Sequence, residues 1–306
     1  MSSIVTRPPE IEEIPILQDI WKSGFGEDPD MSLFFDHYFS PKLCVVACLD
    51  TAPVGAGYLI PIGDLVYAAR RFPCSYIYAV AVMAECRGLG LGTAVVQGLI
   101  ESGRASGYPL IALCPAEDTL FEYYSERTGL SEWFYTREIK TTAPDHYNTS
   151  VYLSEISVAE YSDIRERLLS RTPHIEHNLR AIEYQRLLCQ SHGGGLYSVK
   201  IGGDIFCATV DIQENRQVLI KELLAPVGMY NAVFFALTTL FPATSYLIRT
   251  PVKNIDNKDN RRFGMLAIPH GFSFDNDTNS LPPVPSQLNH CSECLDPTPW
   301  FGLAFD

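Results

Sequence analysis

Three alternating glycines give this chain its clearest chemical signal. They lie in the run Arg87-Gly-Leu-Gly-Leu-Gly92, between a stretch rich in Val, Ile and Tyr at 76–82 and a second stretch at 93–100. The first stretch favours an extended strand, and the second favours a helix with one apolar face. Apolar residues recur on that face at every fourth position, namely Leu91, Val95 and Leu99. Because such a turn leaves backbone N–H groups unshielded at the positive end of a helix, the sequence predicts an anion site in this loop.

The spacing within the loop distinguishes between kinds of glycine-rich anion site. A dinucleotide-binding loop has the pattern G-x-G-x-x-G, but position 93 is Thr and the strand lies well inside the chain. A Walker loop requires G-K-[ST], and this loop contains no Lys. The pattern that fits is R-x-x-G-x-G, made by Arg87, Gly90 and Gly92, after a strand end that reads V-x-x-E-x-R.

This pattern resembles the acyl-CoA pyrophosphate loop of the GNAT (GCN5-related) N-acetyltransferase superfamily. The resemblance implies that acetyl-CoA is the cosubstrate and that acetyl is transferred directly to an amine, without an acyl-enzyme. In this family the loop donates backbone N–H groups to the pyrophosphate, and the preceding strand splays from its neighbour to pair with the pantetheine arm. The cofactor-binding residues that the resemblance implies are Val80, Ala81, Val82, Arg87, Gly88, Leu89, Gly90, Leu91, Gly92 and Thr93.

The resemblance also implies a general acid. The family uses a Tyr in the helix after the fifth strand to protonate the CoA thiolate, and Phe121-Glu-Tyr-Tyr-Ser125 matches that helix. Tyr124 is the predicted acid. It lies five residues before Gly129, whereas the usual F-Y-x-x-x-G pattern has four, so Tyr123 stays an alternative. A packed aromatic on a helix face is the other interpretation of this pair.

The general base has no equally clear candidate. No carboxylate lies within the strand at 76–82, where some members of the family place a base. Glu27 and Asp28, in a loop expected to border the acceptor, are tentative candidates, and so is Glu222 in the second half of the chain. Each of the three is also explained as a solvated or structural acid.

Composition limits the partners. The 306 residues carry a net charge of -13, which argues against nucleic acid or an anionic membrane surface and favours an amine acceptor, either a small molecule or a peptide. There is no run of 18 apolar residues, and the first residues lack the apolar core of a signal peptide. We therefore expect a cytoplasmic protein that makes no membrane contact, as a monomer or homodimer.

The elements around the loop follow the GNAT order ααβββαβαβ. They are helices at 11–23 and 31–39, strands at 43–49, 54–61 and 76–82, the helix after the loop, a strand at 110–114, a helix at 120–127 and a strand at 133–140. A similar order recurs from 151 to 250, with helices at 159–169 and 175–191, and the tail adds an edge strand at 263–266. We expect an α/β protein (an α+β mixed sheet) with two tandem GNAT folds, at 1–145 and 146–306.

The second copy has a degenerate loop. Its counterpart of the glycine loop is Pro226-Val-Gly-Met-Tyr230, with one Gly, no Arg, and a Pro that removes a backbone donor. We expect it to hold no pyrophosphate, so that one cofactor binds per chain. The rival hypothesis is a catalytically inactive module that binds acyl-CoA or a partner.

No metal site is predicted. Cys291 and Cys294 form a single C-x-x-C, and even with His270 the chain has no second pair to complete the four ligands of a structural zinc.

Overall fold

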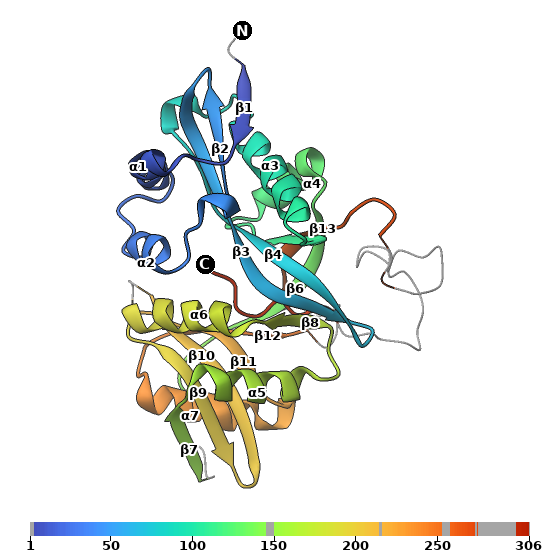
Figure 1. Cartoon of the computed structure of the whole chain (residues 1–306). Helices are drawn as coiled ribbons and strands as arrows, with labels where there is room; N and C mark the ends of the chain where they lie inside the picture. The colour runs from blue at the N-terminus through green and yellow to red at the C-terminus, as the bar shows by residue number, and fades with distance from the viewer. Residues whose placement is uncertain are drawn as a thin grey trace. The chain divides into compact units, whose positions relative to one another are not determined.

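The computed structural model has a mixed α/β architecture, which confirms the expected fold class (Figure 1). It describes residues 3–144, 150–213, 216–252, 258–272, 274 and 298–305. These residues form two compact units: unit 1 within 1–64, 70–133 and 264–284, and unit 2 within 65–69, 134–263 and 285–306. In the described part of the chain, no helix has the length and apolar character that a bilayer span requires.

Unit 1 is built on five strands that follow one another in space as they do in sequence. Their bounds are β1 (Ile4–Arg7), β2 (Cys44–Leu49), β3 (Ala52–Tyr67), β4 (Arg70–Val82) and β5 (Leu110–Leu113). Its helices are α1 (Ile14–Phe25), α2 (Asp30–His37), α3 (Leu91–Ala105) and α4 (Thr119–Thr128). Figure 1 shows α1 and α3 on opposite sides of these strands. Strands β4 and β5 are parallel, joined by α3, whereas β1, β2 and β3 pair antiparallel.

The apolar face of α3 forms the centre of the unit 1 core. Leu91, Val95 and Leu99 are all buried, as their spacing predicts, and they pack on strand residues such as Val45 and Ile77. Burial of each such side chain is worth roughly 1.5–3 kcal/mol, so this face holds the helix start in a fixed place against the sheet.

The β3–β4 hairpin is longer than the sequence suggested. Its two-residue turn is Ala68-Ala69, and both residues have positive φ, 48° and 60°. Turns of this kind normally contain Asn-Gly or Asp-Gly. Without that signature the sequence predicts strands only at 54–61 and 76–82, whereas β3 continues to Tyr67 and β4 starts at Arg70.

The strands of unit 2 follow the spatial order β6–β12–β11–β10–β9–β7. The bounds of these strands are β6 (Ser131–Thr141), β7 (Val151–Glu155), β9 (Gly195–Ile201), β10 (Asp204–Ile212), β11 (Val218–Leu224) and β12 (Tyr246–Pro251). Its helices are α5 (Val158–Leu169), α6 (Leu179–Ser191) and α7 (Tyr230–Leu240). Strands β11 and β12 are parallel and are joined by α7, which is the same strand–helix–strand arrangement as β4, α3 and β5.

One predicted helix start was wrong. Residues 174–177 form a short strand, β8 (His174–His177), and α6 begins only at Leu179. The Asn178 side chain accepts a hydrogen bond from the backbone N–H of Ala181 at 2.8 Å. This N-cap fixes the helix start and leaves the preceding residues extended.

Each unit takes one strand from the other half of the sequence. Strand β6 follows α4 in the chain but pairs antiparallel with β12 in unit 2. Residues 265–267 of β13 (Asn260–Ala267), near the end of the chain, pair antiparallel with β5 in unit 1, whereas an edge position in the second sheet was expected. Neither unit is therefore a continuous stretch of sequence.

Candidate active site at the β4–α3 turn

The end of β4 runs beyond its parallel neighbour. The β4–β5 ladder stops at the pair Ile77–Leu113, while β4 continues to Val82. Residue Ala79 has a φ of 48°, a left-handed conformation that costs roughly 1–2 kcal/mol for a residue with a Cβ. The strand is thus bent where the ladder ends, and the backbone of 80–82 has no β5 residue opposite it. Here lie Val80, Ala81 and Val82, three of the predicted cofactor-binding residues.

The glycine loop has the geometry of an open anion site. Gly88 and Gly90 have φ of 79° and 83°, a region that only glycine adopts freely. A Cβ built on either glycine would meet no atom within 4 Å, so the space in front of the backbone is open. Gly90 is the N-cap of α3 and has no side chain to satisfy the first-turn N–H groups, which include those of Leu91 to Thr93. These donors, together with the helix dipole, suit an anion such as a pyrophosphate.

Arg87 links the start of the loop to the end of α1 and to the end of β4. Its guanidinium donates from Nη2 to the carbonyl of Ser23 at 2.7 Å and from Nε to the carbonyl of Val82 at 3.3 Å. The Leu89 side chain, between Gly88 and Gly90, is 55% exposed.

The two candidate acids have different surroundings, although they are adjacent on α4. The Tyr123 hydroxyl is hydrogen-bonded to the Thr93 hydroxyl at 2.8 Å, and it lies 3.5 Å from the position that a Cβ on Gly92 would take. Tyr124 packs against the apolar core under α3, and burial raises its pKa to about 12, with a smaller contribution from Tyr123. The centroids of the Tyr123 and Tyr124 rings are 5.2 Å apart. Helix α4 therefore presents one tyrosine to the glycine loop and buries much of the next.

The loop acids after α1 are held to different extents. Asp28 accepts hydrogen bonds from Trp21 Nε1 and from the backbone N–H of Asp30, both at 2.9 Å. The Glu27 side chain is 86% exposed, and its carboxylate lies 3.4 Å from Lys22 Nζ. Asp28 thus orders the α1–α2 connection, while Glu27 stands in solvent.

Glu222 belongs to unit 2 and is completely buried. Its carboxylate accepts hydrogen bonds from Tyr161 Oη at 2.6 Å, Arg165 Nε at 3.0 Å and Trp300 Nε1 at 2.6 Å. The Arg165 guanidinium is itself completely buried, and these contacts favour a structural role for Glu222.

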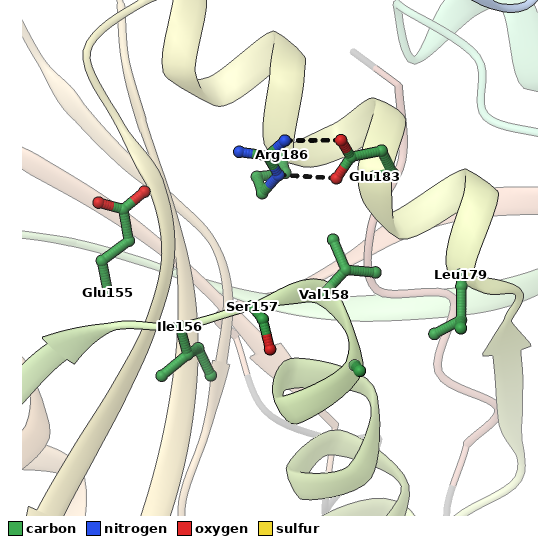
Figure 2. Close-up of a pocket in the computed structure, with 8 residues that line it drawn as sticks. Glu155, Ile156, Ser157, Val158, Leu179, Glu183 and Arg186 are labelled. Atoms are coloured by element: carbon green, nitrogen blue, oxygen red, sulfur yellow. Dashed lines mark hydrogen bonds and ion pairs between the residues drawn. The ribbon is translucent and has the colours of Figure 1, made fainter.

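Unit 2 has a surface hollow next to the first residues of α5 and α6. In unit 2 a hollow of about 620 Å³ lies between the start of α5 and one side of α6. Figure 2 shows Arg186 at its rim, forked onto the Glu183 carboxylate with distances of 2.6 and 2.7 Å. The Glu183 carboxylate therefore balances the positive charge of Arg186.

The β11–α7 connection, the counterpart of the glycine loop in unit 2, is a short 3₁₀ turn, Val227–Met229, preceded by Pro226.

Two links at the site had no signal in the sequence. They are the hydrogen bond between Thr93 and Tyr123 and the one between Ser23 and Arg87, which joins residues 64 positions apart. Cys291 and Cys294, the C-x-x-C pair, lie outside the described residues. Among the described residues, no group of three or more His, Cys, Asp or Glu side chains could hold a metal.

Residues 12–125 match the model of the family described as "Acetyltransferase (GNAT) family". At the level of sequence, no curated protein matches the chain.

Several solved structures have a similar fold over both halves of the chain. A GCN5-related N-acetyltransferase from Anabaena variabilis has a TM-score of 0.65 at 16% identity, covering 86% of this chain and 72% of that one. A probable N-acyltransferase from Enterococcus faecalis has a TM-score of 0.65 at 14% identity, covering 87% and 72%. Eis1 from Mycobacterium abscessus has a TM-score of 0.58 at 13% identity, covering 87% and 73%. At these identities the likeness establishes the fold alone.

Proposed function

We propose, from the match of residues 12–125 to the GNAT acetyltransferase family, that the chain is an acyltransferase that transfers an acetyl group from acetyl-CoA directly to an amine. The acceptor is a small molecule or a peptide. The net charge of -13 agrees with a cationic acceptor, because an acidic surface attracts ammonium groups.

The observation that carries this proposal is the continuity of three features at the end of β4. The ladder with β5 ends, the strand goes on to Val82, and a glycine loop then opens α3 with uncapped N–H groups. An extended strand edge followed by an anion site suits a ligand with an amide-containing arm and a pyrophosphate. Acetyl-CoA has both, and it supplies the activated acetyl group.

The residues present fit such a ligand. The backbone of Val80, Ala81 and Val82 would pair with the pantetheine arm, and the backbone N–H groups from Arg87 to Thr93 would bind the pyrophosphate. Gly88 and Gly90 leave the approach open, since side chains there would stand in the space in front of the loop. The Pro226–Met229 connection of unit 2 offers no comparable run of donors, so we propose one cofactor per chain, with the second half as a degenerate GNAT copy.

The chemistry requires a neutral amine and a proton for the leaving thiolate. For a lysine-like amine with a pKa near 10.4, deprotonation at pH 7 costs about 4–5 kcal/mol, whereas alignment in the site can supply roughly 7–11 kcal/mol. The amine nitrogen bonds to the acetyl carbon, the carbon–sulfur bond breaks, and the electron pair leaves on sulfur. Tyr124 would give this sulfur its proton, with Tyr123 as the alternative donor. Glu27 or Asp28 would accept the proton of the amine, whereas the contacts of Glu222, the third candidate, favour a structural role.

Calorimetry with acetyl-CoA, followed by a CoA-release assay, tests the proposal. The assay panel contains polyamines, amino acids, aminoglycosides and peptide N-termini. We expect saturable binding of one acetyl-CoA per chain and turnover with at least one amine. A chain that does not bind acetyl-CoA would refute the proposal, and binding without turnover on any amine would favour the inactive-module alternative.

A further inference from the structure

The Arg87 side chain reaches the end of α1. Its two hydrogen bonds end on the carbonyls of Ser23 and Val82. Ser23 lies in the last turn of α1, where carbonyl groups have no partner within the helix and the dipole is negative. A guanidinium is well suited to this position because it is charged and can donate to two acceptors at once.

A second hydrogen bond joins the same two segments, and Ser23 is again the acceptor. The Ser23 hydroxyl accepts from the backbone N–H of Ala84 at 3.0 Å. Close packing accompanies these bonds, since a Cβ on Gly24 would come within 2.7 Å of the Ala81 Cβ. The end of α1 is therefore tied to the segment that runs from the strand end into the glycine loop.

The two segments joined by these hydrogen bonds have different proposed roles. One is the loop of donors for the pyrophosphate. The other is the segment 24–28, whose Glu27 and Asp28 are proposed to border the acceptor and whose Gly26 N–H closes α1 on the Lys22 carbonyl at 2.8 Å. A change in the mobility of the glycine loop can therefore be transmitted to the segment 24–28 through the hydrogen bonds on Ser23 and the adjoining backbone.

We propose that Arg87 is a positioning residue that couples occupation of the glycine loop to the ordering of the α1 end, so that cofactor binding prepares the acceptor side. This inference rests on the proposed function. Its physical content is a coupling free energy, and coupling between two binding events must be reciprocal. An anion in the loop fixes the backbone at 87, which fixes the carbonyl of Ser23 through the guanidinium.

Hydrogen exchange with CoA as the probe tests the coupling without knowledge of the amine. In the wild-type chain, saturating CoA should slow exchange in 88–93 and also at Gly26, by at least roughly fivefold, the lower end of typical coupling. In Arg87→Lys, which keeps the positive charge but not the two-armed donor, slowing should persist in 88–93 and disappear at Gly26. Ser23→Ala, which removes the Ala84 bond and leaves the guanidinium unchanged, should reduce the slowing at Gly26.

Controls separate this inference from the proposed function. Arg104→Met removes an exposed arginine at the far end of α3 and should leave the response at Gly26 unchanged, and melting curves establish that each variant is folded. Equal slowing at Gly26 in wild type and Arg87→Lys would overturn the coupling role. CoA binding without any slowing at Gly26 in the wild type would also overturn it, while leaving the proposed function intact. Absence of CoA binding in the wild type would refute both.

Discussion

The hydroxyl groups of Tyr123 and Thr93 are hydrogen-bonded at 2.8 Å, which joins α4 to the first turn of α3. The Arg127 guanidinium lies over the Tyr123 ring, 5.3 Å from its centroid, and adds a second restraint. Tyr123 is thus held at the glycine loop by its hydroxyl, whereas the neighbouring Tyr124 is held by burial. This difference makes their roles separable by mutation.

Removal of the Tyr124 hydroxyl should act on the chemical step. We expect Tyr124→Phe to lower kcat by roughly 10²- to 10⁴-fold, the usual contribution of a general acid, and to change the affinity for acetyl-CoA little. Tyr123→Phe, the matched control, breaks the bond to Thr93 and should mainly weaken acetyl-CoA binding. Steady-state kinetics and calorimetry on both variants distinguish these effects. The reverse pattern would assign the acid role to Tyr123.

Tyr124 should also affect stability at high pH. Its pKa is about 12 in the folded chain because of burial, against about 10 in an unfolded chain. The unfolded chain therefore releases this proton first, and the stability contributed by the protonated side chain is fully present below pH 10 and is lost as the pH rises towards 12. Denaturant titrations from pH 8 to 12 should show a smaller alkaline loss in Tyr124→Phe than in the wild type. Parallel curves would argue against the buried environment.

The backbone conformation of Gly90 should be necessary for cofactor binding. Gly90→Ala places a Cβ at a φ of 83°, with a strain of roughly 1–2 kcal/mol, so that affinity for acetyl-CoA should fall by roughly 5- to 30-fold. Gly129→Ala is the matched control, since Gly129 has a φ of 74°, ends α4 and likewise has open space around its Cβ position. It should lose similar stability and keep its affinity. Equal affinity losses in both variants would contradict a specific role for the loop.

Glu222 can be tested as a base and as a structural group in one experiment. Glu222→Gln removes the fully buried counter-charge of Arg165 and leaves it only the partly exposed Glu166, and we expect a loss of about 3–5 kcal/mol in the free energy of unfolding. The exposed Glu27→Gln should change this quantity by less than about 0.5 kcal/mol. Unfolding curves and CoA-release assays are run on both variants. A Glu222→Gln chain with unchanged stability and no turnover would instead support the proton-acceptor role.

The strand–loop–helix at the candidate site was predictable because its signals are local. Alternating glycines, a Val-rich strand and apolar residues four apart lie within a single short stretch, and the structure confirms the strand and the helix. The side-chain links were not predictable, because Ser23 and Arg87 are brought together only by the packing of α1 on β4. Likewise, the Ala68-Ala69 turn has no residue that marks a left-handed conformation, so the full length of the β3–β4 hairpin was missed.

The pairing of β6 with β12 and of β13 with β5 affects how the chain can fold during synthesis. The strand that pairs with β5 of the glycine-loop unit is nearly the last one synthesised, so the ladder on β5 stays incomplete until residues 265–267 have left the ribosome. A fragment that stopped at residue 145 would expose the edge of β5 and carry β6 without its β12 partner. Unpaired strand edges promote aggregation. A piece expected to yield a well-folded glycine-loop unit must therefore extend at least through residue 267.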